Sequence, residues 1–122
     1  MAFQRTTIAV IDDDFGVRNA MEQLLTAVGY RVESFASAEE FISAAPTSEA
    51  ACCLVDIQLG DISGVELGRH LTAIGLSFPI IFMTGSDDET LRRQAMDFGC
   101  IAYLTKPIPV ERLIEAIAQA VG

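Results

Sequence analysis

The chain has 122 residues, and a chain of that length fits one domain because ordinary domains run to about 100–150 residues. Its hydrophobic fraction of 51% is spread along the whole length, so we expect a single compact domain over residues 1–122. The formal net charge of −9 argues against direct nucleic-acid binding. We expect a cytoplasmic protein, because the sequence has no signal peptide pattern and no apolar run near the ~20 residues of a membrane span.

The predicted elements alternate between strand and helix. Short apolar runs of strand length lie at Thr7–Ile11, Arg31–Phe35, Cys52–Asp56, Ile80–Thr84 and Ile101–Leu104. After the first run, a helical apolar face carries Val17, Met21, Leu24, Leu25 and Val28. We expect that helix to end at Gly29, and the next to open with a capping box of Ser37 and Glu40 and to stop near Pro46.

Three further helices follow the last three strands. The third begins after Ser63, and Gly64 and Gly68 would each weaken it by roughly 1 kcal/mol relative to Ala. Its inward side is predicted to hold Val65, Leu67, Leu71 and Ile74. The fourth starts near Asp87 or Asp88 and ends at Gly99. The fifth has an apolar stripe of Val110, Leu113, Ile114, Ile117 and Val121.

This repeated alternation predicts an α/β fold in which a parallel sheet is covered by helices on both faces. We expect the strand order 2-1-3-4-5, with the ligand site beyond the carboxyl ends of strands 1 and 3. Asp12 and Asp13 follow the first strand, and Asp56 ends the third. Three close carboxylates repel unless a cation compensates them, and Mg²⁺ prefers such oxygen ligands. The sequence therefore predicts a Mg²⁺ site at this edge.

Two further polar residues are expected at the same edge of the sheet. Thr84 ends the fourth strand and supplies a hydroxyl, while Lys106 follows the fifth strand and supplies an ammonium group. Each residue alone is common in turns, strands or surfaces. Together with a metal and a carboxylate nucleophile, for which Asp56 is the best candidate, they are the groups that stabilise a phosphoryl group during transfer.

The motifs at these strand ends resemble those of response-regulator receiver domains of bacterial two-component systems. They are Ile11-Asp12-Asp13-Asp14, Leu54-Val55-Asp56 with Gly64 eight residues on, Met83-Thr84-Gly85 and Leu104-Thr105-Lys106-Pro107. The resemblance covers essentially the whole chain, and the segment from Asp61 to Leu67 is similar to FixJ-like receivers in particular. It implies the flavodoxin-like (βα)5 receiver fold.

The resemblance implies a regulatory phosphoacceptor that assists its own phosphorylation and slow dephosphorylation, and not an enzyme that turns over a substrate. Asp56 would receive the phosphoryl group from a sensor histidine kinase or a phosphotransfer protein. Asp13, Asp56 and the main-chain carbonyl of Gln58 would bind Mg²⁺, or Mn²⁺ as a substitute, and Asp12 would act through water.

The resemblance also implies a switch. Thr84 would swing toward the phosphoryl group, Lys106 would bridge to it, and Tyr103 would turn inward as Thr84 moves. The Lys106-Pro107 bond would be cis. The signal would leave through the face made by helix 4, strand 5 and helix 5, with homodimerisation on phosphorylation as one outcome.

The segment after Asp56 departs from the family pattern. It reads Gln58-Leu59-Gly60-Asp61, whereas many members have Met-Pro there. Glycine gives the backbone more freedom than proline, so we expect a looser loop and weaker Mg²⁺ binding. In the family, the positions of Gln58 and Ser86 tune hydrolysis of the phospho-aspartate, so the resemblance implies that role for both residues here.

Three rival interpretations remain open from the sequence. Asp12-x-Asp14 is similar to the nucleophile motif of haloacid-dehalogenase-type phosphatases, but those need another acidic pair after the lysine, where this chain offers only Glu111 and Glu115 on an amphipathic helix. A flavodoxin-like cofactor binder would present Ser, Thr or Gly donors where this chain has acids that repel phosphate. A degenerate receiver would lack some of the residues for phosphorylation, and here all are present.

Overall fold

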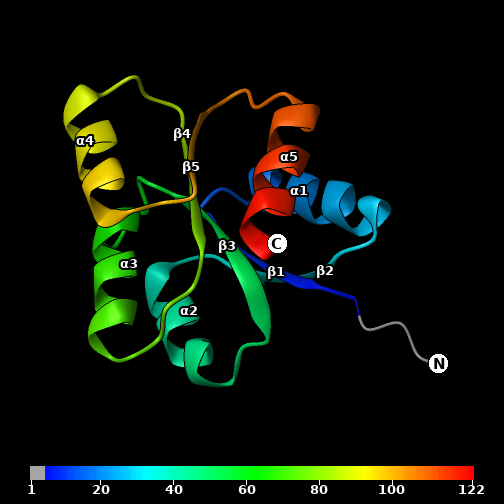
Figure 1. The fold of residues 1–122 in the computed structure, drawn as a ribbon, viewed down its shortest axis with the longest axis horizontal. Coiled ribbons are helices and arrows are strands. Elements are labelled where there is room, and N and C mark those ends of the chain that lie inside the picture. Colours follow the sequence, from blue (N-terminus) through cyan, green and yellow to red (C-terminus); the bar gives the residue numbers. More distant parts are fainter. Residues whose placement is uncertain (1–4) are drawn as a thin grey trace.

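The computed structural model describes residues 5–122, in which strands and helices alternate along the chain. The strands are β1 (Thr7–Ile11), β2 (Arg31–Phe35), β3 (Ala50–Asp56), β4 (Ile80–Thr84) and β5 (Ala102–Thr105). They form one parallel sheet with the order β2-β1-β3-β4-β5 (Figure 1). The predicted α/β fold and strand order are therefore confirmed.

Helices cover both faces of this sheet. They are α1 (Phe15–Val28), α2 (Ala38–Ala44), α3 (Gly64–Ala73), α4 (Glu89–Phe98) and α5 (Val110–Val121), with a short 3-10 helix at Ala45–Thr47. Figure 1 places α1 and α5 on one side of the sheet and α2, α3 and α4 on the other. Alternate residues of β1 accordingly enter two cores, Ile8 and Val10 on the side of α1 and α5, Ala9 and Ile11 on the opposite side. Among the described residues, no helix is both long and apolar enough to cross a bilayer.

Two strands have bounds that differ from those expected. β3 begins at Ala50, before the expected Cys52, because Ala50 already pairs with Thr7 across a local shift in register. β5 runs from Ala102 to Thr105, whereas Ile101–Leu104 was expected. Ile101 donates one hydrogen bond to the carbonyl of Ile80 but lies in the bend that precedes the strand.

The predicted helix ends are mostly confirmed by side-chain or glycine caps. Gly29 has a φ of 115°, in the left-handed region that glycine tolerates, and closes α1. Ser37 accepts a hydrogen bond from the Glu40 N–H at the start of α2. The Glu40 carboxylate returns to the N–H of Ala36 and not to that of Ser37, so the capping box is displaced by one residue.

The two glycines of α3 allow close approach between elements. A Cβ added at Gly64 would lie 2.9 Å from the carbonyl oxygen of Asp56, and one at Gly68 would lie 2.6 Å from Cζ of Phe98. Loss of helix propensity, the expected effect of these residues, is thus only part of their role. Ile74 was predicted to face inward and is instead 49% exposed, because it lies at the end of α3. Val28 and Val110, also at helix ends, are exposed for the same reason.

Candidate functional site

Three carboxylates meet at the carboxyl edge of the two central strands. Ile11 and Val55 are paired in the β1–β3 ladder, which places Asp12 and Asp13 beside Asp56. One carboxylate oxygen from each acid lies within 4.8 Å of the others, and within residues 5–122 no other group of three such side chains is close enough to hold a metal ion. Asp12 and Asp56 are buried, whereas Asp13 is exposed. Oxygen ligands in this arrangement suit a hard divalent cation.

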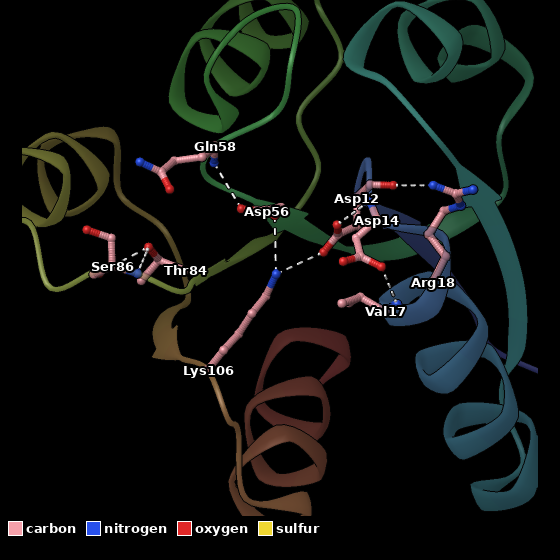
Figure 2. Close-up of polar contacts among 9 residues, drawn as sticks. All are labelled: Asp12, Asp14, Val17, Arg18, Asp56, Gln58, Thr84, Ser86 and Lys106. Atoms are coloured by element: carbon pink, nitrogen blue, oxygen red, sulfur yellow. Dashed lines mark hydrogen bonds and ion pairs between the residues drawn. The ribbon is translucent and has the colours of Figure 1, made fainter.

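Lys106 brings a positive charge to the buried pair of acids. Its Nζ lies 3.1 Å from Oδ2 of Asp12 and 3.2 Å from Oδ2 of Asp56 (Figure 2). Burial opposes the charged form of Lys106, but the two carboxylates outweigh it and raise the pKa of the ammonium group. The Lys106-Pro107 peptide bond is cis, as the resemblance implied.

Asp56 is held by a donor at each oxygen. The Gln58 N–H donates to Oδ1 at 2.9 Å, and Lys106 donates to Oδ2. Burial raises the pKa of Asp56 and the negative charge of Asp12 adds to that effect, while both donors lower it; the net pKa is raised. The two donors therefore offset only part of the cost of burying this carboxylate beside Asp12.

The turn after β1 is fixed by its own side chains. Oδ1 of Asp12 accepts a hydrogen bond from the Asp14 N–H at 2.9 Å, and Asp14 caps α1 by accepting from the Val17 N–H. Arg18 reaches back from α1 and donates to the carbonyl oxygen of Asp12 at 2.7 Å (Figure 2). Arg18 could not be predicted from the sequence, because a hydrogen bond to a main-chain carbonyl leaves no pattern in a single sequence.

Thr84 lies at the end of β4, in the strand next to β3. Its hydroxyl donates to the Ser86 carbonyl oxygen and accepts from the Ser86 N–H, both at 3.1 Å. These bonds keep the buried hydroxyl within its own loop (Figure 2). The Lys106 main-chain N–H donates to the carbonyl oxygen of Thr84 at 2.7 Å. The structure places Thr84 at the expected edge of the sheet.

Tyr103 lies on β5 and is paired with Phe82 of β4. Its hydroxyl is buried close to Thr84, but within residues 5–122 it makes no hydrogen bond of normal geometry. The Arg92 guanidinium lies 5.5 Å from the centre of the ring. Burial raises the pKa of the phenol. Tyr103 also lines a groove of about 310 Å³ between α4 and α5, together with Arg112.

Two buried cysteines lie in the same central strand and pack in the hydrophobic cores. Cys52 and Cys53 belong to β3 and face opposite cores. Burial raises the pKa of Cys52 to about 12 and that of Cys53 well above its ordinary value. Neither thiol is therefore a nucleophile at neutral pH.

Comparison with known proteins agrees with this geometry. Residues 8–118 match the family model described as "Response regulator receiver domain". The chain is 32% identical over 120 residues to the response regulator protein TodT of Pseudomonas putida, covering 98% of this chain and 53% of TodT. It is 35% identical over 114 residues to the transcriptional regulatory protein FixJ of Bradyrhizobium diazoefficiens, covering 93% of this chain and 56% of FixJ. The chain thus spans about half the length of the curated relatives it matches.

Solved structures give the same result for the fold. The crystal structure of FixJ-N superposes with a TM-score of 0.90 at 34% identity, covering 98% of this chain and 95% of that one. A CheY-like receiver domain protein from Methanospirillum hungatei superposes with a TM-score of 0.89 at 27% identity, covering 97% and 94% of the two chains. The flavodoxin-like receiver fold is confirmed.

Proposed function

The chain belongs to the response regulator receiver domain family, and from this premise we propose that it is the phosphoacceptor switch of a two-component phosphorelay. Asp56 takes a phosphoryl group from a sensor histidine kinase or a phosphotransfer protein. One observation carries the proposal: Asp12, Asp13 and Asp56 converge within 4.8 Å, with the Lys106 ammonium 3.2 Å from Asp56. A carboxylate beside a cation site and a fixed ammonium is suited to phosphoryl transfer.

The residues at the site fit a divalent ion. Lys106 forms ion pairs with Asp12 and Asp56, whereas Asp13 forms none within the described part of the chain. One ammonium therefore faces three carboxylates. Asp13, Asp56 and the Gln58 carbonyl would hold Mg²⁺, or Mn²⁺ in its place, with Asp12 acting through water. When bound, the ion offsets the charge that develops on the phosphoryl oxygens.

The transfer step uses the ionised carboxylate of Asp56 as the nucleophile. As its oxygen bonds to phosphorus, the phosphorus–nitrogen bond of the donor phosphohistidine breaks and the electron pair stays on the imidazole nitrogen. The Gln58 N–H and the Lys106 ammonium favour the ionised form of Asp56, against the effect of burial. Lys106 and the Thr84 hydroxyl then donate to the transferred phosphoryl oxygens.

The output step begins at Thr84. To donate to a phosphoryl oxygen, its hydroxyl must give up the two hydrogen bonds to Ser86. The Tyr103 hydroxyl is already buried beside Thr84, so movement of Thr84 changes its surroundings directly. The change passes to the face formed by α4, β5 and α5, where Arg92 and Arg112 line the groove beside Tyr103. This face would contact a target or a second copy of the chain.

Incubation with acetyl phosphate and Mg²⁺, followed by intact mass spectrometry, tests the proposal. The wild type is expected to gain one phosphoryl group, and a chelator is expected to prevent the gain. Asp56→Asn should gain none, while Asp97→Asn, which removes an exposed acid of α4, should behave as the wild type. A gain that persists in Asp56→Asn would contradict the proposal, and rapid turnover of acetyl phosphate with no detectable adduct on the wild type would favour a phosphatase.

A further inference from the structure

The loop between β3 and α3 runs beside the acid cluster. Its base is closed by a hydrogen bond of 2.9 Å from the Gly64 N–H to the Ile57 carbonyl oxygen and by a bridge between Gln58 and Ser63. The remaining tip comprises residues 59–62. A Cβ added at Gly60 would lie 3.7 Å from Oδ2 of Asp13, so the backbone of the tip is a direct neighbour of the cluster.

The side chain of Asp61 connects the tip to helix α2 by two hydrogen bonds. Oδ2 of Asp61 accepts from the Glu39 N–H at 3.1 Å, and Oδ1 accepts from the Ala38 N–H at 3.4 Å. Both donors belong to the first turn of α2, where N–H groups have no partner within the helix. Among the described residues, these are the only side-chain hydrogen bonds between the tip and another helix or strand.

Helix α2, which donates these two hydrogen bonds to Asp61, is itself packed into the core. Ala38 and Phe41 of α2 are fully buried, and Phe41 packs edge-on against Phe35 with ring centres 5.1 Å apart. Slight burial of Asp61 opposes its charged form, but the main-chain N–H groups outweigh this and lower the pKa of the carboxyl group. Asp61 is thus a charged acceptor on a rigid helix end, which is a favourable place for a carboxylate.

The tip needs an external support because Gly60 gives its backbone freedom. Leu59 is buried and anchors the tip on one side of Gly60. On the other side, Ile62 packs against the core only in part, and Asp61 is exposed and is held through its carboxylate. Without that carboxylate, Gly60 and Asp61 would be held only by the packing of Leu59 and Ile62 on either side, and their backbone could move away from Asp13.

We propose that Asp61 is a positioning residue of the metal site, which holds the loop so that the Gln58 carbonyl stays beside Asp13 and Asp56. This inference rests on the proposed function, because it concerns the Mg²⁺ that the function requires. Asp61 does not touch the ion. It acts by limiting the number of loop conformations that binding must otherwise select.

Calorimetric titration of the full chain with Mg²⁺ tests this role. Asp61→Ala is expected to lower the affinity about 10-fold, the smaller end of the range for groups that orient metal ligands. Asp61→Asn, which keeps one oxygen acceptor, should be intermediate and serves as the milder variant if Asp61→Ala folds poorly. The exchange of amide hydrogens in residues 58–63, measured without metal, should be faster in Asp61→Ala than in the wild type.

Two matched controls separate positioning from stability and from charge. Ser37→Ala removes another hydrogen-bond acceptor at the start of α2 and leaves the loop untouched. Glu39→Gln removes a negative charge from the same helix turn and keeps the main-chain donor to Asp61. Both should bind Mg²⁺ as the wild type does.

The outcomes are distinct. Wild-type affinity and wild-type loop exchange in Asp61→Ala would overturn the inference, and so would an equal loss of affinity in Glu39→Gln, since charge alone would then explain it. A wild type that binds no Mg²⁺ would refute the proposed metal site, and the positioning role with it.

Discussion

Lys106 forms ion pairs with both buried acids of the site, and Lys106→Met removes them with little change in side-chain length. The ammonium lies 3.1 Å from Asp12 and 3.2 Å from Asp56. At an effective dielectric constant of about 20, each pair has a Coulomb energy of about 5 kcal/mol, most of which offsets the loss of hydration. Removing one partner of a buried pair costs about 3–5 kcal/mol because the other charge is left uncompensated.

Two features of the site reduce this figure. The Lys106 side chain is 26% exposed, and Asp56, whose pKa is raised by burial, can take up a proton once the ammonium is gone. We therefore expect the free energy of unfolding to fall by about 2–3 kcal/mol at neutral pH without metal. Urea unfolding followed by circular dichroism measures it. Arg93→Met, which removes an exposed cation of α4, should change stability by less than about 0.5 kcal/mol.

Addition of Mg²⁺ should reverse part of the loss. The ion no longer competes with an ammonium group in Lys106→Met, so Mg²⁺ should stabilise the variant more than the wild type. A variant as stable as the wild type in metal-free buffer, or equal stabilisation of both proteins by Mg²⁺, would refute the reasoning about crowded carboxylates.

Three other substitutions test separate parts of the account. Because burial raises the pKa of Asp56, its ionised form destabilises the fold at neutral pH. Asp56→Asn should therefore unfold at a higher urea concentration than the wild type in metal-free buffer. This gain in stability should vanish as the pH falls through the raised pKa to below the ordinary value of 3.8. Gly68→Ala should lower the free energy of unfolding, measured in urea, by about 1 kcal/mol. Overpacking against Phe98 costs about 1–3 kcal/mol, which exceeds the gain in helix propensity of about 1 kcal/mol. A variant more stable than the wild type would contradict the close approach of α3 to Phe98. Gly60→Pro should bind Mg²⁺ more tightly than the wild type in a calorimetric titration because proline restricts the loop, and equal affinities would discard that effect.

The sequence was sufficient for most of the fold. β1, β2 and β4 have the predicted bounds because each is a short apolar run closed by turn or acidic residues. The start of β3 depended on pairing between Ala50 and Thr7, which local composition does not reveal. The outward position of Ile74 depended on where α3 ends, since helical periodicity alone places it on the inner face.

The candidate site was predictable where its residues follow strand ends. Asp12, Asp13, Asp56 and Lys106 could be placed at one edge because parallel strands share that edge. Arg18 and Asp61 could not, because both act on main-chain atoms of segments that only the tertiary structure brings near.

The central claim is that three carboxylates share one divalent ion, and calorimetric titration of the wild type and Asp13→Asn with Mg²⁺ tests it most directly. Asp13 is exposed, so its replacement should leave the fold intact. The wild type is expected to bind one ion per chain, and Asp13→Asn to bind at least about 10-fold more weakly because it loses a direct ligand. Absence of Mg²⁺ binding by the wild type, or undiminished affinity in Asp13→Asn, would contradict the account.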